Sequence, residues 1–398
     1  MFSPSKIKKD FPIFSDSDLV YLDNAATTQK PQSVLDAVDS LYKEANANVH
    51  RALYSLGSEA TERFETSRKK VANFIGAHSK EIIFTSGTTE SINLLAHSLG
   101  NILKPGDEIL ISEMEHHSNI VPWQMAAKRT GAILKYLSIT ETGELDLTNS
   151  EKYFTSKTKI VSLTHLSNVL GTINPINNLA KLAHDVGAIM IVDGAQGVPH
   201  MNVNIQELGC DFYAFSGHKM LGPTGIGVLW GKPELLDEME PFMGGGEMIN
   251  TVTMKASTWN DIPYKFEAGT PNFAQAVGLG AAIDYLEKIG MDAIQNHEKT
   301  ITQYALDKMN NIDGLRIHGS AKKRGGVISL NVDGIHPHDL AQFLNEDNIA
   351  IRVGHHCAQP LLKKLGETAT ARMSFYIYND ESDVDKFCDS ISEIQKLF

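Results

Sequence analysis

Two residues that directly follow apolar segments could together carry out covalent chemistry. Asp193 follows the apolar run 188–192, and Lys219 comes shortly after the run 211–215. An acid at a buried strand end needs a cationic partner, and a protonated pyridine nitrogen is one. A lysine that burial keeps neutral can form a Schiff base with an aldehyde. The pair therefore fits pyridoxal phosphate, although a capped turn and a solvated lysine are the ordinary explanations for each residue alone.

A turn of small residues could hold the phosphate of such a cofactor. Residues 86–89 (Ser-Gly-Thr-Thr) lie between an expected strand at 81–85 and an expected helix at 90–96. Free N–H groups and the helix dipole attract an anion there, which makes Thr88 a candidate. Taken alone the signal is weak, because such a turn is also ordinary capping chemistry. Further cofactor contacts are expected from Ser216 and His218 at the phosphate and from Gln196 at the ring hydroxyl.

Imidazole groups follow two more of the expected strands. His116 comes after the strand at 107–112, and His165 comes after the strand at 159–164. A single histidine in such a turn is more often a hydrogen-bonded structural residue. His116 could equally stack on the flat ring of a cofactor.

Cys357 is the reactive candidate among three cysteines. It lies in residues 354–360 (Gly-His-His-Cys-Ala-Gln-Pro), and Arg352 comes just before. Nearby histidines and an arginine favour the thiolate by lowering the thiol pKa from about 8.5. Glycine before and proline after it predict a bent loop. Cys210 and Cys388 are expected to be packing residues at the start of a strand and in an amphipathic terminal helix.

A metal site is the main alternative for the cysteine loop. Its ligands would come from His116, His117, His355, His356 and Cys357. Adjacent histidines cannot easily face one ion, and the spacings match none of the usual zinc patterns. We therefore expect no metal ligands in this chain.

Arg372 is the candidate for substrate recognition. It lies in residues 370–374, shortly after the cysteine loop. A guanidinium group can hold an amino-acid carboxylate through two parallel N–H bonds. A surface salt bridge is the ordinary alternative for an arginine that stands alone.

The elements that must position these residues alternate along the first two thirds of the chain. Short β-branched runs and helix-length segments follow one another, which predicts βα units and a mostly parallel sheet. Ligands of such sheets gather beyond the carboxyl ends of the strands, where the candidates above fall. Strands are expected at 81–85, 107–112, 159–164, 188–192, 211–215 and 225–230, with a helix at 58–74.

The pattern changes after residue 275. A long helical stretch at 276–309 leads to a strand at 327–332 and a helix at 338–346, which predicts a smaller α+β unit. We expect residues 31–275 to form a large cofactor-binding domain and residues 276–398 a small C-terminal domain that carries the cysteine loop. Residues 1–30 are expected to pack near the small lobe, since chain ends often lie together.

Composition excludes several classes of protein. The chain has 398 residues, with 36 Lys and Arg against 48 Asp and Glu, for a net charge of −12. This sign is wrong for a protein that neutralises nucleic-acid phosphates. Three cysteines are too few for a disulfide framework and fit a reducing compartment. No stretch approaches 18 apolar residues, and residues 1–14 lack a signal-peptide core, so we expect a cytoplasmic enzyme with no membrane partner.

Motifs along nearly the whole chain resemble the class V aminotransferase family of pyridoxal phosphate fold type I. Within it they resemble the SUF-type (SufS-like) cysteine desulfurases. The double histidine before Cys357 and the glycine-rich residues 244–249 look like that branch. The motifs are residues 21–28, 48–51, 86–90, 115–119, 193–196, 216–219, 244–249, 266–271 and 352–360.

The resemblance implies a homodimer with an α/β fold, a large domain and a smaller α+β domain. It implies conversion of L-cysteine to L-alanine, with the sulfur left as a persulfide on Cys357. A sulfur-acceptor protein of the SUF system would then take that sulfur for iron–sulfur cluster assembly. In this scheme Lys219 is the Schiff-base lysine, Asp193 the pyridinium partner, and His116 the stacking residue and proton carrier.

The resemblance also implies further ligand contacts. Gln196 would contact the ring hydroxyl. Phosphate contacts would come from Thr88, Ser216 and His218, and from Thr270 of the other subunit. Substrate carboxylate contacts would come from Arg372 and Asn168, with Ala25 and Arg352 nearby.

Two departures from the family pattern and several alternatives stay open. Val353 stands where many relatives have Thr, and Tyr54 where many have His, which leaves turnover rate and acceptor preference open. A selenocysteine lyase or a cysteine sulfinate desulfinase would use the same fold. A metal-dependent hydrolase or a non-catalytic sulfur-binding scaffold are alternatives from other classes.

Overall fold

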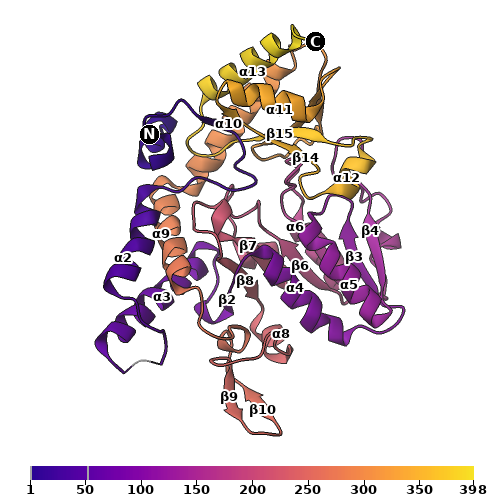
Figure 1. The fold of residues 1–398 in the computed structure, drawn as a ribbon. Coiled ribbons are helices and arrows are strands. Elements are labelled where there is room, and N and C mark those ends of the chain that lie inside the picture. Colours follow the sequence, from indigo (N-terminus) through magenta and orange to yellow (C-terminus); the bar gives the residue numbers. More distant parts are fainter. Residues whose placement is uncertain (1, 52) are drawn as a thin grey trace.

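The computed structural model describes residues 2–51 and 53–398, and a seven-stranded sheet lies at its centre (Figure 1). Neighbouring strands are parallel except β8, which is antiparallel to both of its neighbours. The predicted mostly parallel sheet is therefore confirmed. In spatial order the strands are β2 (Ile82–Thr85), β8 (Gly227–Gly231), β7 (Phe212–Ser216), β6 (Ile189–Asp193), β5 (Thr158–Thr164), β3 (Glu108–Ser112) and β4 (Ile133–Leu137).

Helices cover both faces of this sheet, which is why its central strands are apolar on both sides. Alternate residues of a strand point to opposite faces. In β7, Phe212 and Ala214 pack with α4 (Thr88–Ser98) and α5 (Val121–Thr130). Tyr213 and Phe215 face a second cluster. That cluster includes side chains of α3 (Ser55–Phe74), α6 (Ile176–Asp185) and α9 (Phe273–Ile289).

The expected long helix at 276–309 is a wrong prediction, because the structure has two helices there. They are α9 and α10 (Met291–Met309). Gly290 separates them with a φ of 92°, a left-handed conformation that glycine adopts without a steric penalty. α9 packs against α3 and α2 (Gln32–Glu44), whereas α10 packs against the C-terminal helix α13 (Glu381–Gln395).

A second, antiparallel sheet lies above the first in Figure 1 and carries the C-terminal candidates. Its helices α10, α11 (Pro337–Glu346) and α13 share a core with its strands. β1 (Val20–Tyr21) pairs in parallel with β13 (Ile349–Ala350), so this early segment lies against that unit. The division at 30 and 275 stays a prediction. In spatial order the strands are β11 (Leu315–His318), β12 (Val327–Val332), β15 (Thr370–Ser374) and β14 (Arg352–Gly354).

The remaining elements are short. The hairpin of β9 (Ile249–Val252) and β10 (Ser257–Trp259) projects from the lower end of the molecule in Figure 1. The others are α1 (Pro4–Ile7), α7 (Ile205–Leu208), α8 (Pro233–Glu238) and α12 (Gln359–Lys364). Among the helices described, none combines the length and apolar character that a bilayer span requires.

Candidate active site

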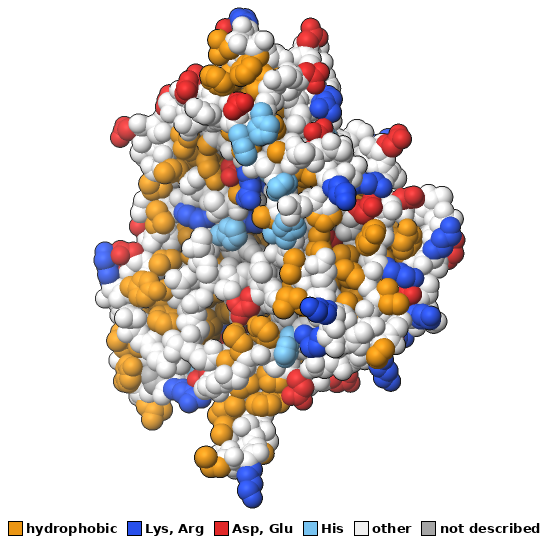
Figure 2. Space-filling model, turned by 45° about the vertical axis from the view of Figure 1, so that its right-hand side comes forward, with side chains coloured by type: hydrophobic (Ala, Val, Ile, Leu, Met, Phe, Trp, Pro, Cys, Tyr) orange, Lys and Arg blue, Asp and Glu red, His pale blue; other side chains and the backbone are white. Residues whose placement is uncertain are grey.

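A cavity of about 230 Å³ lies beyond the carboxyl ends of the central strands. It brings together most of the residues that the sequence singled out, and Figure 2 shows histidine side chains gathered near the middle of one face. Cys357 is not among its lining residues but contacts one of them, Arg352. The predicted residues that line it are Ala25, Thr88, His116, Asn168, Asp193, Gln196, Ser216, His218, Lys219, Arg352 and Arg372.

Asp193, which is buried, and Lys219, which is partly exposed, both line this cavity. Asp193 ends β6 and accepts a hydrogen bond from the Ala195 N–H at 3.0 Å. Burial raises the pKa of Asp193, and the charge of Lys219 opposes the shift. Burial lowers the pKa of Lys219 to about 8, against the attraction of Asp193. The amine is therefore largely neutral in mildly alkaline solution, which is the state that a Schiff base requires.

The turn that presents Lys219 is held by a segment that the sequence analysis did not single out for this role. The His218 carbonyl accepts hydrogen bonds from the Thr28 N–H at 3.1 Å and from Lys30 Nζ at 2.9 Å. Burial lowers the pKa of Lys30 to about 7, and burial lowers that of His218 to about 4. No local signal predicts this contact, because nearly 190 residues separate the two segments.

The expected phosphate turn closes against the end of β7. Ser216 Oγ accepts the backbone N–H of Thr88 at 2.9 Å and lies 2.7 Å from Thr88 Oγ1. β8 allows this approach only because it carries Gly227, where a Cβ atom would lie 2.3 Å from the Cα of Gly87. Hydroxyls and the N-terminus of α4 therefore meet at one point, as an anion site requires.

His116 lines the cavity, and one of its ring nitrogens accepts a hydrogen bond from the backbone. Its Nδ1 accepts the Ser118 N–H at 3.1 Å, which leaves the ring proton on Nε2. Burial, assisted by Lys219 and other cations, lowers the pKa of His116 to about 3, so the ring is neutral.

Glu115 directly precedes His116 and is fully buried, a feature that the sequence analysis missed. It accepts hydrogen bonds from Ser112 Oγ at 2.5 Å and from Asn119 Nδ2 at 2.6 Å. Burial raises the pKa of Glu115 to about 8. A carboxyl group that is largely protonated at neutral pH therefore supports the segment behind the His116 ring.

Arg372 approaches the cavity from β15 and is fixed by two contacts. Its Nη2 donates to Asp23 at 2.8 Å and its Nη1 donates to the Asn168 carbonyl at 3.1 Å. Burial lowers the pKa of Arg372, while Asp23 opposes the shift. Asp23 lies within residues 21–28, a segment for which the sequence analysis named only Ala25 as a site residue.

The cysteine loop joins β14 to α12 in an irregular conformation. His356 and Cys357 both have positive φ values, 51° and 57°, which side-chain-bearing residues seldom adopt. Arg352 Nη2 lies 3.6 Å from Cys357 Sγ, within hydrogen-bond distance of sulfur. Cys357 is partly exposed.

Backbone and side-chain groups from distant segments hold this loop. The His117 N–H donates to the Cys357 carbonyl at 2.7 Å, and His117 Nε2 accepts the Gln359 N–H at 3.0 Å. Asn168 Nδ2 donates to the His356 carbonyl at 2.8 Å. The ring of His356 is itself buried against Thr370. The sequence analysis weighed His117 only as a metal ligand, and its neighbour His116 gave no signal of this loop contact.

Two unpartnered polar atoms show what the cavity can accept. Gln196 Nε2 donates to the Ala25 carbonyl at 2.7 Å, but the buried Gln196 Oε1 has no partner. The buried Nε of Arg372 also has none. Buried polar atoms are normally satisfied. An acceptor for a ring hydroxyl, a donor for a carboxylate, a buried acid and a lysine with a lowered pKa fit pyridoxal phosphate bound with an amino acid.

The other cysteines and the histidines show no comparable arrangement. Burial raises the pKa of Cys210 to about 12 and that of Cys388 to about 11. Among residues 2–51 and 53–398, no group of three or more His, Cys, Asp or Glu side chains is placed to hold a metal ion.

Among the described residues, Thr270, unlike Cys357, neither lines the cavity nor hydrogen-bonds to a residue that lines it. It borders a separate surface hollow of about 170 Å³. Its neighbours there include Asn48, Arg51 and Glu247, and Arg51 Nε pairs with Glu247 at 2.5 Å.

Comparison with known proteins identifies relatives that match almost the whole chain. The model of the class-V aminotransferase family matches residues 20–387. A probable cysteine desulfurase of Halalkalibacterium halodurans is 53% identical over 99% of this chain and 98% of its own. A cysteine desulfurase of Haloferax volcanii is 48% identical over 98% of this chain and 97% of its own.

Solved structures extend the comparison to the fold. The apo structure of a cysteine desulfurase from Thermococcus onnurineus NA1 superimposes with a TM-score of 0.96 at 42% identity, over 100% of this chain and 99% of that one. The cysteine desulfurase CsdA of Escherichia coli gives 0.94 at 39% identity, with both chains fully covered. The predicted fold type is confirmed, and the chain belongs to the class-V aminotransferase family.

Proposed function

We propose that this protein is a pyridoxal phosphate-dependent cysteine desulfurase that converts L-cysteine to L-alanine and takes the sulfur onto Cys357. Full-length relatives at about half identity carry that activity in their names. The observation that carries the proposal is the position of Cys357, 3.6 Å from an arginine that lines the cavity of Lys219 and Asp193. Lys219 and Asp193 would bind the cofactor, and Cys357 would accept the sulfur.

Residues at the ends of β2, β6 and β7 would hold the cofactor. When bound, pyridoxal phosphate supplies an electron sink for the negative charge that develops on substrate carbon as the C–S bond breaks. Asp193 would stabilise a proton on the ring nitrogen, Lys219 would bind the aldehyde, and Gln196 Oε1 would accept from the ring hydroxyl. Thr88, Ser216 and His218 would bind the phosphate.

Arg372 orients the substrate. Its unpartnered Nε–H is available to a substrate carboxylate, and Asn168 and Asp23 fix the guanidinium plane through the other nitrogens. Ala25 lies in the same cavity, so substrate is confined between residues 24–26 and β15. His116 covers the site with Nε2 carrying the ring proton, from which it can move a proton to or from substrate.

Sulfur transfer balances without an external oxidant. The Cys357 thiolate sulfur attacks the substrate sulfur, a new S–S bond forms, and the substrate C–S bond breaks. The electron pair of that bond goes to the substrate carbon, which takes up a proton to give alanine. The enzyme is left as the Cys357 persulfide, so each substrate yields one alanine and one transferable sulfur atom.

Cys357→Ser tests this assignment, and Cys388→Ala is its matched control because Cys388 is buried in the small-domain core. The serine variant is expected to keep the visible absorbance of the bound cofactor and to lose alanine formation by at least about a hundredfold. The control keeps both. Alanine formation by Cys357→Ser at the wild-type rate would exclude Cys357 as the sulfur acceptor.

The active form is a homodimer in which Thr270 reaches the phosphate of the other subunit. Its separation from the cavity of its own chain supports this arrangement. Thr270→Val is expected to weaken cofactor affinity by about tenfold, and sedimentation measurements report whether the dimer persists. A monomeric wild-type enzyme with full activity would exclude the arrangement.

The physiological sulfur acceptor is a small sulfur-carrier protein of the SUF system, in the cytoplasm. Three free cysteines among 398 residues support a reducing compartment. The double histidine before Cys357 supports this branch of the family. Radioactive sulfur from L-cysteine should pass from Cys357 to such a carrier, and a carrier that stays unlabelled beside labelled enzyme would exclude it.

A further inference from the structure

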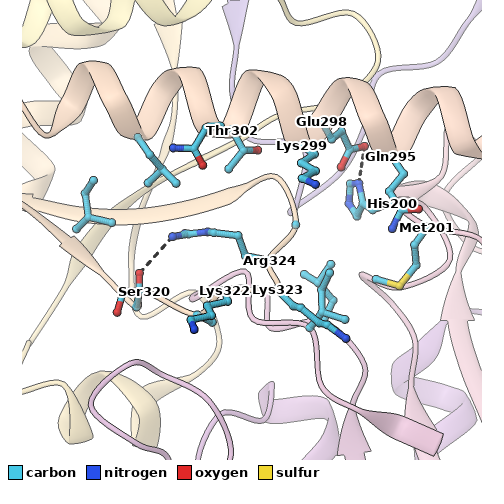
Figure 3. Close-up of a pocket in the computed structure, with 18 of the residues that line it drawn as sticks. His200, Met201, Gln295, Glu298, Lys299, Thr302, Ser320, Lys322, Lys323 and Arg324 are labelled. Atoms are coloured by element: carbon cyan, nitrogen blue, oxygen red, sulfur yellow. Dashed lines mark hydrogen bonds and ion pairs between the residues drawn. The ribbon is translucent and has the colours of Figure 1, made fainter.

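A second cavity, of about 890 Å³, lies outside the site described above (Figure 3). One wall is α10, and the opposite wall is the segment 319–325 that leads into β12. His200 and Met201 close one end. A volume of this size is typical of sites for drug-sized ligands.

The charge of this cavity is opposite to that of the protein. The chain has a net charge of −12, yet Lys299, Lys322, Lys323 and Arg324 all line the cavity. The only carboxylate among the lining residues, Glu298, is buried and bonded to His200 at 2.9 Å. Lys299, Lys322 and Lys323 are exposed. Their positive charge is therefore available to an anion that enters.

Two polar atoms in the cavity wall have no hydrogen-bond partner in the described part of the chain. One is Oγ1 of Thr302, whose side chain is 3% exposed on α10. The other is Nε of Arg324. Both Nη atoms of Arg324 donate to backbone carbonyls, among them Val327 O at 2.9 Å and Leu170 O at 3.4 Å. A guanidinium bonded only to carbonyls keeps its charge unpaired.

The lining also has an apolar part, which an inorganic ion would not use. We propose that the cavity binds a small organic phosphate, with its phosphate among the cations and its less polar part against the apolar side chains. The amides at the rim provide hydrogen bonds to that part. The apolar side chains are Leu166, Ile173, Met201, Leu306 and Ile317, and the amides are Gln295, Asn296, Gln303 and Asn310.

The loop of residues 166–173 lies between this cavity and the active site. Leu166 lines both cavities. On the side of the second cavity, the Ile173 N–H donates to the Lys323 carbonyl at 3.0 Å, and the Gly325 N–H donates to the Gly171 carbonyl at 2.9 Å. Gly171 has a φ of 71°, and a Cβ there would lie 2.7 Å from Val327 O, so only glycine fits this packing.

The same loop contacts the cysteine loop on its other side. Asn168 donates to the His356 carbonyl, and its own carbonyl accepts from Arg372. A ligand bound to Lys323 and Arg324 therefore restrains the segment that supports Cys357. Coupling of this kind is reciprocal, so occupancy of one site changes the other. Occupancy of the second cavity is expected to slow access to Cys357.

Calorimetric titration of the cofactor-loaded enzyme with adenosine 5′-diphosphate tests the proposal, because the cofactor then fills the phosphate turn at Thr88. Lys322→Ala/Lys323→Ala removes two exposed cations from the cavity. Lys104→Ala/Lys128→Ala removes the same charge from exposed positions elsewhere. We expect the diphosphate to bind, about tenfold more weakly to the first variant and unchanged to the second. Pyrophosphate should bind more weakly than the nucleotide, and adenosine should not bind.

Three results would overturn the proposal. The first is that the wild type does not bind the diphosphate, and the second is that all three proteins bind it with the same affinity. The third is that both lysine variants lose the same affinity, because that result would indicate general charge attraction. If pyrophosphate binds as tightly as the nucleotide, the cavity is a site for an inorganic anion and not for an organic phosphate. The coupling predicts that the diphosphate slows iodoacetamide labelling of Cys357 by about twofold or more in the wild type and in Lys104→Ala/Lys128→Ala, and by less in Lys322→Ala/Lys323→Ala at the same ligand concentration. An unchanged labelling rate with ligand bound would overturn the coupling.

Discussion

The cofactor site and the cysteine loop are built in opposite ways. Asp193 ends β6 and Lys219 follows β7, two neighbouring strands whose residues are almost all buried. Cys357 lies partly exposed on an irregular loop with two successive left-handed residues. The sheet fixes the first region, whereas side chains from distant segments fix the second. The difference matches the proposed chemistry, because a cofactor must stay in place while a thiol must meet a substrate and then an acceptor.

Lys219→Ala should break the first region alone and has the largest expected effect. Loss of the amine that binds the aldehyde and moves protons should lower alanine formation by about 10³-fold or more. The visible absorbance of the lysine-bound cofactor should vanish. Iodoacetamide should still label Cys357, because the loop contacts do not involve Lys219. Persistence of the absorbance would exclude this lysine.

His117→Ala should break the second region alone. It removes the acceptor of the Gln359 N–H, a contact of about 1 kcal/mol, so alanine formation should fall by about fivefold. The cofactor absorbance should be unchanged. His338→Ala, on the exposed face of α11, is the matched control. Equal activities in the two variants would show that His117 does not hold the loop.

Glu115→Gln changes a residue next to both regions, since His116 lines the cavity and His117 contacts the cysteine loop. Of the three substitutions it has the smallest expected effect on activity. Burial raises the pKa of Glu115 to about 8 from the ordinary 4.5. Between these values the unfolded chain loses the proton and the folded chain keeps it, so the wild type loses stability as pH rises. Above about 8 the loss levels off. Glutamine removes this dependence.

Thermal unfolding at several pH values measures the effect of Glu115→Gln. The melting temperature of the variant should gain on that of the wild type as pH rises from about 5 to about 8. A difference that stays constant over this range would mean that Glu115 ionises normally in the folded protein.

The sequence predicted the first region better than the second. Asp193, Ser216 and Lys219 could be found because residues that follow parallel strands gather at one edge of a sheet. The strands themselves were recognisable as buried apolar runs. β4 was missed because most of its residues are not buried, so it forms no such run. The break at Gly290 was missed because helical periodicity continues on both sides.

The contacts that hold the cysteine loop could not be predicted in the same way. His117 reaches residues more than 200 positions away, and Asp23 reaches Arg372 across almost the whole chain. Such pairs leave no spacing or periodicity in a single sequence. The burial of Glu115 is likewise a tertiary property, since a Glu beside two histidines reads locally as a polar turn. The sequence pattern therefore predicts residues that lie at strand ends, and it does not predict contacts between side chains that are distant in the sequence.

Mass spectrometry of cysteine-containing peptides, after brief exposure of the cofactor-loaded enzyme to L-cysteine, tests whether Cys357 accepts the substrate sulfur. We predict one additional sulfur atom on Cys357, removable by a reductant, and none on Cys210 or Cys388. We also predict alanine in an amount equal to the bound sulfur in a single turnover. Alanine formation with an unmodified Cys357 peptide would contradict the account.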